Sequence, residues 1–262
     1  MLGGSVVDRA WSGLKARGAW YAQGGGKLRE LYTIMHLPYT SMVLSYTLIG
    51  AALSPTIYLN RVVLTLVAYF LGLGLSAHAL NELHANHWTE ALGKRELTVL
   101  FAVPLVAAIG IGIYAMVDLL ALSNSIVPPV VLMGFIILES FFLFAYNTDA
   151  FGGILHSDLS FAFSWAALPT VIGYYVNALR ITSVAVLVAL AMAATAGIEI
   201  NLSRWCKEFR RKSPLTNMRF QDGTQQAIST VQLLARPEKA LKLIVIAVDL
   251  IAMGLIVYRL FP

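Results

Sequence analysis

Residues 61–88, RVVLTLVAYFLGLGLSAHALNELHANHW, join a long apolar run directly to a dense group of polar side chains. A run of about 20 mainly apolar residues is long enough to cross a lipid bilayer as a helix. Histidine, asparagine and glutamate side chains then gather in residues 76–88. This group either lines a binding site at the end of a span or marks the point where the helix leaves the membrane.

The composition of the whole chain places it among membrane proteins. Hydrophobic residues make up 58% of the 262 residues, charged residues only 13%, and the mean hydropathy is +0.72. Soluble domains contain roughly 25% charged residues. We therefore expect an all-α polytopic transmembrane helix bundle with about seven spans. The expected spans are residues 38–54, 61–83, 97–119, 126–146, 159–178, 182–202 and 241–261.

The two ends of the chain differ in character. Residues 1–36 are polar, rich in glycine and basic, without the apolar core of a signal peptide. Aromatic and basic residues alternate there, which predicts a segment lying at the membrane interface. Residues 37–262 form the expected transmembrane domain, with a basic loop at 203–240 and a short amphipathic helix within it at 225–236. A single cysteine, Cys206, excludes a disulfide within the chain.

Basic residues predict the orientation in the membrane. Nearly all of the 19 Lys and Arg residues fall in residues 1–36, 84–96 and 203–242; the exceptions are Arg61, Arg180 and Arg259. Loops rich in Lys and Arg stay on the cytoplasmic side of a membrane. With an odd number of spans in the cell membrane, we expect a cytoplasmic N-terminus and an external C-terminus. The charge indicates attraction to anionic lipid, and no basic soluble domain is present to bind nucleic acid.

Three interpretations of the polar group at 76–88 stay open. Asn81 and Glu82 supply oxygen donors of the kind that Mg²⁺ prefers. Histidines favour a transition metal or a haem instead. The third interpretation is a helix end whose side chains meet lipid headgroups. The candidate ligands of a transition metal are His78, Glu82, His84 and His87, and those of a haem are His78, His84, His87 and His156.

Carboxylates elsewhere in the apolar segments need partners, because a charged side chain within a bilayer is costly. Glu139 and Asp249 lie near the middle of their expected spans, where a polar group on a neighbouring helix is their predicted partner. Glu199 lies close to the polar end of its span, so a place beside a ligand and a structural role are equally supported.

The connection between the fourth and fifth expected spans is the most distinctive part of the chain. It reads YNTDAFGGILHSDLSFAFSWAALPTVIGYYV at residues 146–176. Polar side chains occupy its start, a glycine pair at 152–153 permits a tight backbone, and small, aromatic and proline residues follow. A plain anchor helix does not need this mixture. A groove for an elongated apolar chain does.

Several stretches, taken in order, resemble the UbiA superfamily of membrane prenyltransferases. Residues 28–53, LRELYTIMHLPYTSMVLSYTLIGAAL, are similar to the entry into the first span of that family. Residues 68–90 take the place of its first aspartate-rich motif, N-D-x-x-D-x-x-x-D. Residues 146–176 look like its tyrosine- and glycine-containing loop and fifth span. The resemblance covers about residues 27–212 and implies a UbiA-like bundle of helices around a cavity open to the cytoplasm.

The resemblance also implies how a site would work. Family enzymes hold a prenyl diphosphate through Mg²⁺ bound to two aspartate-rich motifs and ionise it to an allylic cation. Here Asn81 and Glu82 stand at the first two motif positions, and Glu199 and Ser203 stand near the second motif. The remaining aspartate positions of the first motif fall on Ala85 and Thr89. Loss of these carboxylates predicts a weakened two-metal site.

The roles that we expect at such a site are divided among four groups of residues. The metal ligands are Asn81 and Glu82; the groups that neutralise diphosphate in place of the lost metal ligands are Arg204, Lys207 and Arg210. Groups that orient or deprotonate the acceptor are Tyr146, Asp149 and His156. The prenyl-chain cavity is lined by Trp165, Tyr174 and Glu199, where aromatic rings can stabilise an allylic cation.

The sequence therefore predicts a divergent UbiA-like prenyltransferase homologue that transfers or binds a polyprenyl chain, with Mg²⁺ as its expected cofactor. The alternative from another class is a non-catalytic membrane protein that binds an isoprenoid or quinone, or a subunit of a membrane complex. The eroded aspartate motif favours this alternative. Transport is disfavoured, because the spans contain few charges and no paired, interrupted helices.

Overall fold

The computed structural model describes residues 19–22, 26–85, 91–212 and 216–261. These residues form helices and one small β-hairpin, so the expected all-α class is confirmed. Six helical stretches are long and apolar enough to cross a membrane. They are Leu59–His84, Lys94–Ser123, Val127–Asn147, Asp158–Ala178, Ser183–Lys212 and Thr230–Leu260.

Six of the seven expected spans thus appear as helices of sufficient length. The third, α6 (Lys94–Ser123), is one helix that continues through Pro104. The first expected span is α3 (Leu37–Ala52), which has 16 residues. A helix of this length extends about 24 Å, less than the roughly 30 Å of a bilayer core. Its side chains are largely buried, so α3 belongs to the centre of the bundle.

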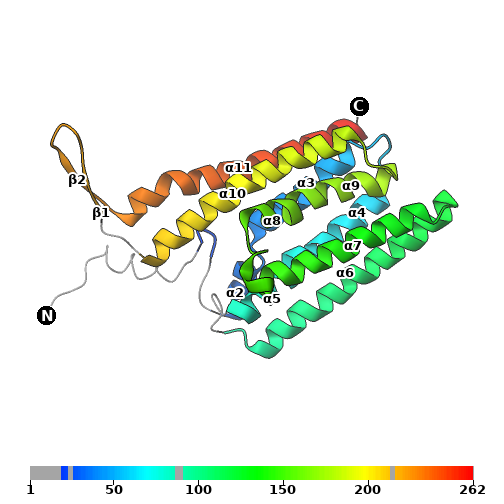
Figure 1. Cartoon of the computed structure of the whole chain (residues 1–262), viewed down its shortest axis with the longest axis horizontal. Coiled ribbons are helices and arrows are strands. Elements are labelled where there is room, and N and C mark those ends of the chain that lie inside the picture. Colours follow the sequence, from blue (N-terminus) through cyan, green and yellow to red (C-terminus); the bar gives the residue numbers. More distant parts are fainter. Residues whose placement is uncertain (1–18, 23–25, 86–90, 213–215, 262) are drawn as a thin grey trace.

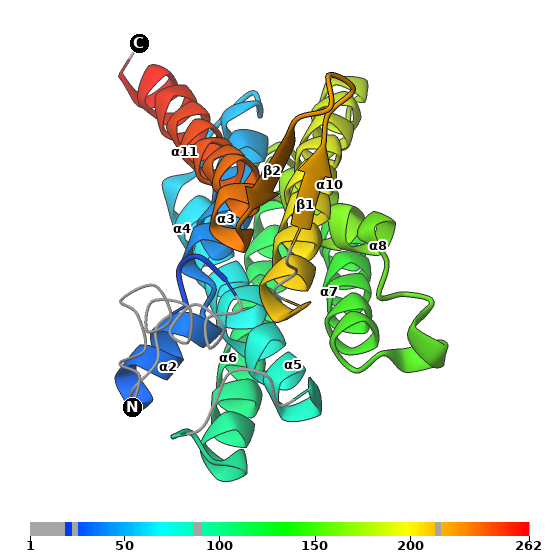
Figure 2. The same ribbon diagram turned by 90° about the vertical axis from the view of Figure 1, so that its left-hand side faces the viewer.

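Helix α3 lies between α9 (Leu168–Ala178) and α11 (Thr230–Leu260), and Figure 2 shows it within the bundle beside α4. Glycines allow α3 and α9 to touch backbone to backbone. A Cβ atom at Gly50 would lie 1.9 Å from the Thr170 carbonyl oxygen, and one at Gly173 would lie 2.1 Å from the Thr47 carbonyl oxygen. Small residues at helix contacts are the usual means of close packing within membranes. The helices α3 and α9 are therefore in direct backbone contact in the core.

Two of the membrane-length stretches contain a wider turn. Helix α4 (Leu59–Tyr69) continues through the π-helical segment η1 (Phe70–Ala77) into α5 (His78–Ala85). Helix α8 (Asp158–Ala162) continues in the same way through η3 (Phe163–Ala167) into α9. An inserted π-turn re-aims the side chains that follow it and is common at functional sites. The segment η1 immediately precedes His78, and η3 contains Trp165.

Long helical hairpins flank this centre. Figure 1 shows α10 (Ser183–Lys212) running beside α11, and α6 running beside α7 (Val127–Asn147). The expected loop at 203–240 has a different structure: α10 continues to Lys212, strands β1 (Thr216–Arg219) and β2 (Gln225–Ile228) pair, and α11 begins at Thr230. Ser229 caps α11, accepting a hydrogen bond from the Gln232 amide. The helix expected at 225–236 is thus confirmed only for residues 230–236, which begin α11, whereas residues 225–228 pair as a strand.

One end of the bundle gathers most of the polar loops. Helix α2 (Lys27–Ile34), α5, the 3₁₀ turn η2 (Ala150–Gly153) and the C-terminal end of α10 lie there (Figure 1). We call it the basic end, because α10 ends there with Lys207, Arg210, Arg211 and Lys212. Most of the interfacial segment expected at 1–36 lies outside the described residues.

Candidate functional site at the basic end

A row of aromatic rings crosses the basic end, with Trp165 of η3 at its centre. The ring centroid of Trp165 lies 5.0 Å from that of His78 and 5.3 Å from that of Phe161, which is stacked on it. His78 in turn contacts His36, at 4.2 Å, and Phe161 contacts Tyr146, at 5.9 Å. Four segments far apart in the sequence thus build one continuous aromatic wall.

The predicted acceptor-binding residues end this wall as one cluster. The His156 ring is stacked on Tyr146 with centroids 4.4 Å apart and planes inclined by 12°. His156 Nδ1 lies 2.9 Å from Asp149 Oδ1 and 2.9 Å from the Tyr146 carbonyl oxygen. Two acceptors at Nδ1 favour the tautomer with its proton there, which leaves Nε2 as a proton acceptor. His84 of α5 also approaches Asp149, at 3.7 Å.

The backbone of the turn after α7 sets this geometry. Asp149, Phe151, Gly152 and Gly153 all have positive φ values, between 50° and 79°. Aspartate adopts this conformation more readily than most residues, whereas a bulky residue such as Phe151 rarely does. A backbone strained at such a position is often found at functional sites. The turn brings the Asp149 carboxylate back toward His156.

Arg204 of α10 connects the Tyr146–Asp149–His156 cluster to α8 and α10 through an ion pair and hydrogen bonds. Its guanidinium forms an ion pair with Asp158 Oδ1 at 2.7 Å. It also donates hydrogen bonds to the Tyr146 hydroxyl at 3.3 Å and to the His156 carbonyl at 3.1 Å. The Arg204 side chain stays 39% exposed, so its charge remains accessible from outside the cluster.

Lys207 lies three residues after Arg204 on α10, close to the same face of the helix. It interacts electrostatically with Glu82 of α5, which is 1% exposed. Lys207 also faces His36, the residue before α3. Burial lowers the pKa of His36 to about 3, and the nearby Lys207 charge adds to this effect. His36 is therefore neutral at physiological pH, and Lys207 is the cation beside it.

Glu199 lies deeper in the bundle, one turn before Ser203 on α10, and is 2% exposed. It interacts electrostatically with the hydroxyl groups of Tyr39 and Tyr146. The Tyr39 hydroxyl donates to Ser203 Oγ at 3.3 Å. Glu199 is thus adjacent to the cluster, at its inner boundary, rather than in a separate apolar cavity.

The other predicted site residues lie elsewhere or have no described contact. Arg210 is buried and forms an ion pair with Glu238 of α11, on the side that carries Cys206. Tyr174 lies toward the opposite end of α9, where its hydroxyl accepts a hydrogen bond from Thr182 Oγ1 at 3.2 Å. Asn81 is half-buried on α5 next to Glu82. The expected ligand position His87 lies outside the described residues.

The donor set does not fit a tightly held Mg²⁺ ion. Asn81 and Glu82 are consecutive residues of α5, so their side chains point about 100° apart around the helix. Glu82 already interacts with the Lys207 cation, which opposes a second cation at the same carboxylate. Among the described residues, no group of three or more His, Cys, Asp or Glu side chains is arranged to hold a metal.

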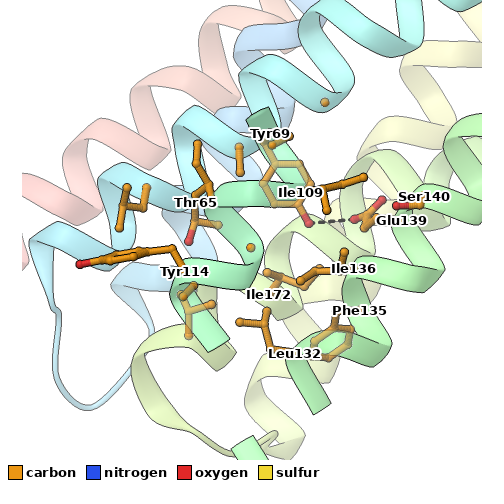
Figure 3. Close-up of a pocket in the computed structure, with 18 of the residues that line it drawn as sticks. Thr65, Tyr69, Ile109, Tyr114, Leu132, Phe135, Ile136, Glu139, Ser140 and Ile172 are labelled. Carbon is orange, nitrogen blue, oxygen red and sulfur yellow. Dashed lines mark hydrogen bonds between the residues drawn. The ribbon is translucent and has the colours of Figure 1, made fainter. Parts of the chain in front are cut away.

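A second candidate site is an apolar pocket of about 130 Å³ between α4, η1, α6, α7 and α9. Its polar lining includes the Arg61–Asp118 ion pair and a hydrogen bond from the Tyr69 hydroxyl to Glu139 Oε1, at 2.8 Å (Figure 3). The interhelical partner predicted for Glu139 is thereby confirmed. Asp249 likewise accepts hydrogen bonds from two serines of α3, at 2.7 and 2.9 Å. The predicted cavity residues Trp165, Tyr174 and Glu199 do not line this pocket.

Sequence reasoning missed His36, Tyr39 and Phe161 at the basic end. His36 adopts a left-handed conformation with φ 44° directly before the Leu37–Pro38 start of α3. The histidine next to a helix-starting proline was the available signal. Phe161 and Tyr39 looked like ordinary apolar-segment aromatics, and only their neighbours in space distinguish them.

Comparison with protein-family models, with curated proteins and with solved structures gives no match to this chain.

Proposed function

We propose that this protein is a divergent UbiA-like prenyltransferase that binds a prenyl diphosphate at the basic end and transfers the prenyl group to an acceptor. The observation that carries the proposal is the cluster in which Arg204 lies against the Asp149–His156 pair. Arg204 and Lys207 provide positive charge for a diphosphate, and His156 provides a base. The proposal rests on this juxtaposition and on the resemblance of residues 27–212.

The diphosphate would be held by charge rather than by metal. Guanidinium and ammonium groups stabilise the charge that develops on a leaving diphosphate, and they do so best in a site with little water. Arg204 is held in place by Asp158 and the Tyr146 hydroxyl before any ligand binds. Binding by these cations does not require Mg²⁺, so the diphosphate should bind in Mg²⁺ and in EDTA alike.

The transfer itself would proceed beside the aromatic wall. The C1–O bond of the allylic diphosphate breaks, and its electron pair leaves with the diphosphate. The acceptor, a molecule with a hydroxyl or another acidic X–H group, forms the new bond to C1 and gives its proton to His156 Nε2. Trp165 and Phe161, which are stacked on each other, would supply the aromatic rings that stabilise the positive charge developing on the allylic carbons.

The orientation that we propose follows from the same arrangement. The basic end faces the cytoplasm and its anionic lipid leaflet, so a water-soluble acceptor reaches His156 from that side. The prenyl chain extends from Arg204 into the apolar bundle, and the C-terminal end of α11 lies on the opposite side of the membrane.

The experiment measures binding and turnover of geranylgeranyl diphosphate by the purified protein in detergent, with Mg²⁺ and with EDTA. Arg204→Ala should weaken binding roughly 10- to 100-fold, the effect of losing one charge-assisted contact. Arg211→Ala, on the exposed face of the same helix, should leave binding unchanged. His156→Asn should retain binding and lower turnover by about a hundredfold or more. The proposal is wrong if Arg204→Ala leaves binding intact and His156→Asn leaves turnover intact.

The second candidate function is a non-catalytic membrane protein that binds an isoprenoid or quinone, or that serves as a subunit of a complex. The pairing of Arg204 with Asp158 and of Lys207 with Glu82 favours it, because both cations already have acidic neighbours. Metal-independent binding of the diphosphate without turnover across a panel of phenol, hydroxyl and amine acceptors would support this second function.

A further inference from the structure

The apolar pocket beside Tyr69 and Glu139 is distinct from the basic end. Glu139 precedes Tyr146 by seven residues on α7, which corresponds to about 10 Å along the helix axis. None of the residues in the Asp149–His156–Arg204 cluster lines the pocket. The pocket is therefore a second candidate binding site, separate from the basic end.

The residues that line the pocket are spread along α6 and α7. Its lining residues extend from Leu105 to Leu119 on α6 and from Leu132 to Leu143 on α7. At 1.5 Å per residue, these stretches measure about 21 Å and about 16 Å. A cavity of about 150 Å³ holds one benzene molecule, so the pocket volume of about 130 Å³ encloses only part of a larger ligand. The spread of the lining residues along α6 and α7 favours an extended chain that lies partly at the surface.

Glu139 supplies one directed polar group within this apolar lining. Its Oε1 accepts a hydrogen bond from the Tyr69 hydroxyl, whereas its Oε2 is buried and has no hydrogen-bond partner among the described residues. A polar atom buried in this way is costly unless a ligand or water satisfies it. Figure 3 shows Glu139 with Tyr69 and Ser140 at one side of the pocket, facing its apolar residues.

The charges of the pocket exclude an anionic headgroup. The cation among its described lining residues is Arg61, which forms an ion pair with Asp118 at 3.1 Å and donates to the Val176 carbonyl at 3.0 Å. A phosphate would thus meet two carboxylates and an arginine that is already neutralised. An uncharged hydroxyl can both donate to and accept from a carboxyl group.

The pocket also opens at the surface of the bundle. Tyr114 of α6 lines its rim and is 59% exposed, on a helix whose outer face is apolar along its length. In a membrane this face contacts lipid chains, so a molecule dissolved in the bilayer reaches the pocket directly.

We propose that this pocket binds an uncharged lipid, a single apolar chain that ends in a hydroxyl group. The hydroxyl lies at Glu139 Oε2, and the chain follows the groove between α6 and α7 and leaves past Tyr114. This site does not depend on prenyl transfer, and its test uses neither a diphosphate nor turnover.

The experiment is photo-labelling of the full chain in lipid nanodiscs with a long-chain alcohol that carries a diazirine in its chain. Labelled residues are identified by mass spectrometry. The matching alkane and the phosphate monoester of the same alcohol serve as comparison probes. We expect the alcohol to label pocket-lining residues of α6 and α7, with unlabelled alcohol competing, and the other two probes to label them several-fold less.

Matched variants locate the site. Ala108→Phe places a ring in the pocket and should lower labelling about tenfold, whereas Val106→Phe adds the same ring on the 70% exposed outer face and should not. Glu139→Leu removes the hydrogen bond and should lower labelling roughly three- to tenfold. Equal labelling by the alkane, preference for the phosphate ester, or equal effects of Ala108→Phe and Val106→Phe would overturn the proposal. The comparison of the three probes on the unaltered chain decides the question even where a variant does not fold.

Discussion

The basic end and the Tyr69–Glu139 pocket handle buried polar groups in opposite ways. At the basic end, charged and polar side chains from α7, η2, α8 and α10 satisfy one another through ion pairs and hydrogen bonds. In the pocket, Arg61 and Asp118 also form an ion pair, but Glu139 has one oxygen bonded to Tyr69 and the other without a hydrogen-bond partner among the described residues. Mutual pairing lowers the cost of burying charges, whereas an unpaired buried polar atom is costly unless a ligand or water satisfies it. This difference is the reason why we propose an anionic headgroup for the first region and an uncharged lipid for the second.

Both regions are built on the same core, so a change in that core should abolish the difference between them. Gly173→Leu places a side chain where the α3 backbone at Thr47 already lies 2.1 Å from a Cβ position. We expect a loss of more than about 3 kcal/mol in the free energy of unfolding, because neither backbone can move aside within the bundle. The yield of monodisperse protein and the unfolding midpoint in detergent measure it.

The control for this change is Gly197→Leu on α10, where no atom lies within 4 Å of the added Cβ. Its unfolding midpoint should stay close to that of the unaltered protein. An equal loss in both variants would show that the α3–α9 contact has no special place in the core.

Lowering the pH should reduce stability through the basic end. His36, which lies there outside the membrane-length helices, has a lowered pKa. The pKa of His36 is lowered to about 3 by burial, next to Tyr21, His78 and Lys207. The unfolded chain, with an ordinary pKa near 6.5, takes up this proton first. Above pH 6.5, His36 is neutral in both states and does not lower the free energy of unfolding. As the pH falls from 6.5 toward 3, protonation of the unfolded chain lowers the free energy of unfolding by at most about 1.4 kcal/mol per pH unit.

His36→Asn removes this titration and keeps a residue that accepts the left-handed backbone at this position. The unfolding midpoint of the variant should fall less between pH 7 and pH 5 than that of the unaltered protein. His84→Asn, at an exposed position of α5, should change the pH dependence less. Parallel pH curves for the unaltered protein and His36→Asn would contradict the assignment.

Loss of the Tyr69–Glu139 hydrogen bond in the pocket should have the smallest effect on stability. Tyr69→Phe removes the donor to Glu139 Oε1 and should cost about 1 kcal/mol in the free energy of unfolding. Diphosphate binding at the basic end should not change. Tyr114→Phe removes a hydroxyl at the exposed rim and should have little effect on the unfolding midpoint. A change in diphosphate binding by Tyr69→Phe would show that the two regions are coupled.

Much of the architecture follows from local features of the chain. Apolar runs long enough to cross a bilayer predict all six helices of membrane length, and four of the six within four residues at both ends, because in lipid the backbone must satisfy its own hydrogen bonds. The length of α10 and the start of α11 were less predictable. Residues 203–212 are too polar for a span but continue a helix, and strand β2 at 225–228 passes directly into α11 at the Ser229 cap.

Some features of the candidate sites could also be predicted from the sequence, whereas others could not. Composition and short spacing were enough to predict a membrane protein, the uneven distribution of basic residues and the clustering of Tyr146, Asp149 and His156 in one connection. Tertiary packing was needed to show that Arg204 reaches this cluster, that Arg210 pairs with Glu238 instead, and that Tyr69 donates to Glu139. These contacts join helices distant in the chain, and their packing is set by glycine contacts and π-turns whose spatial effect no local pattern reveals.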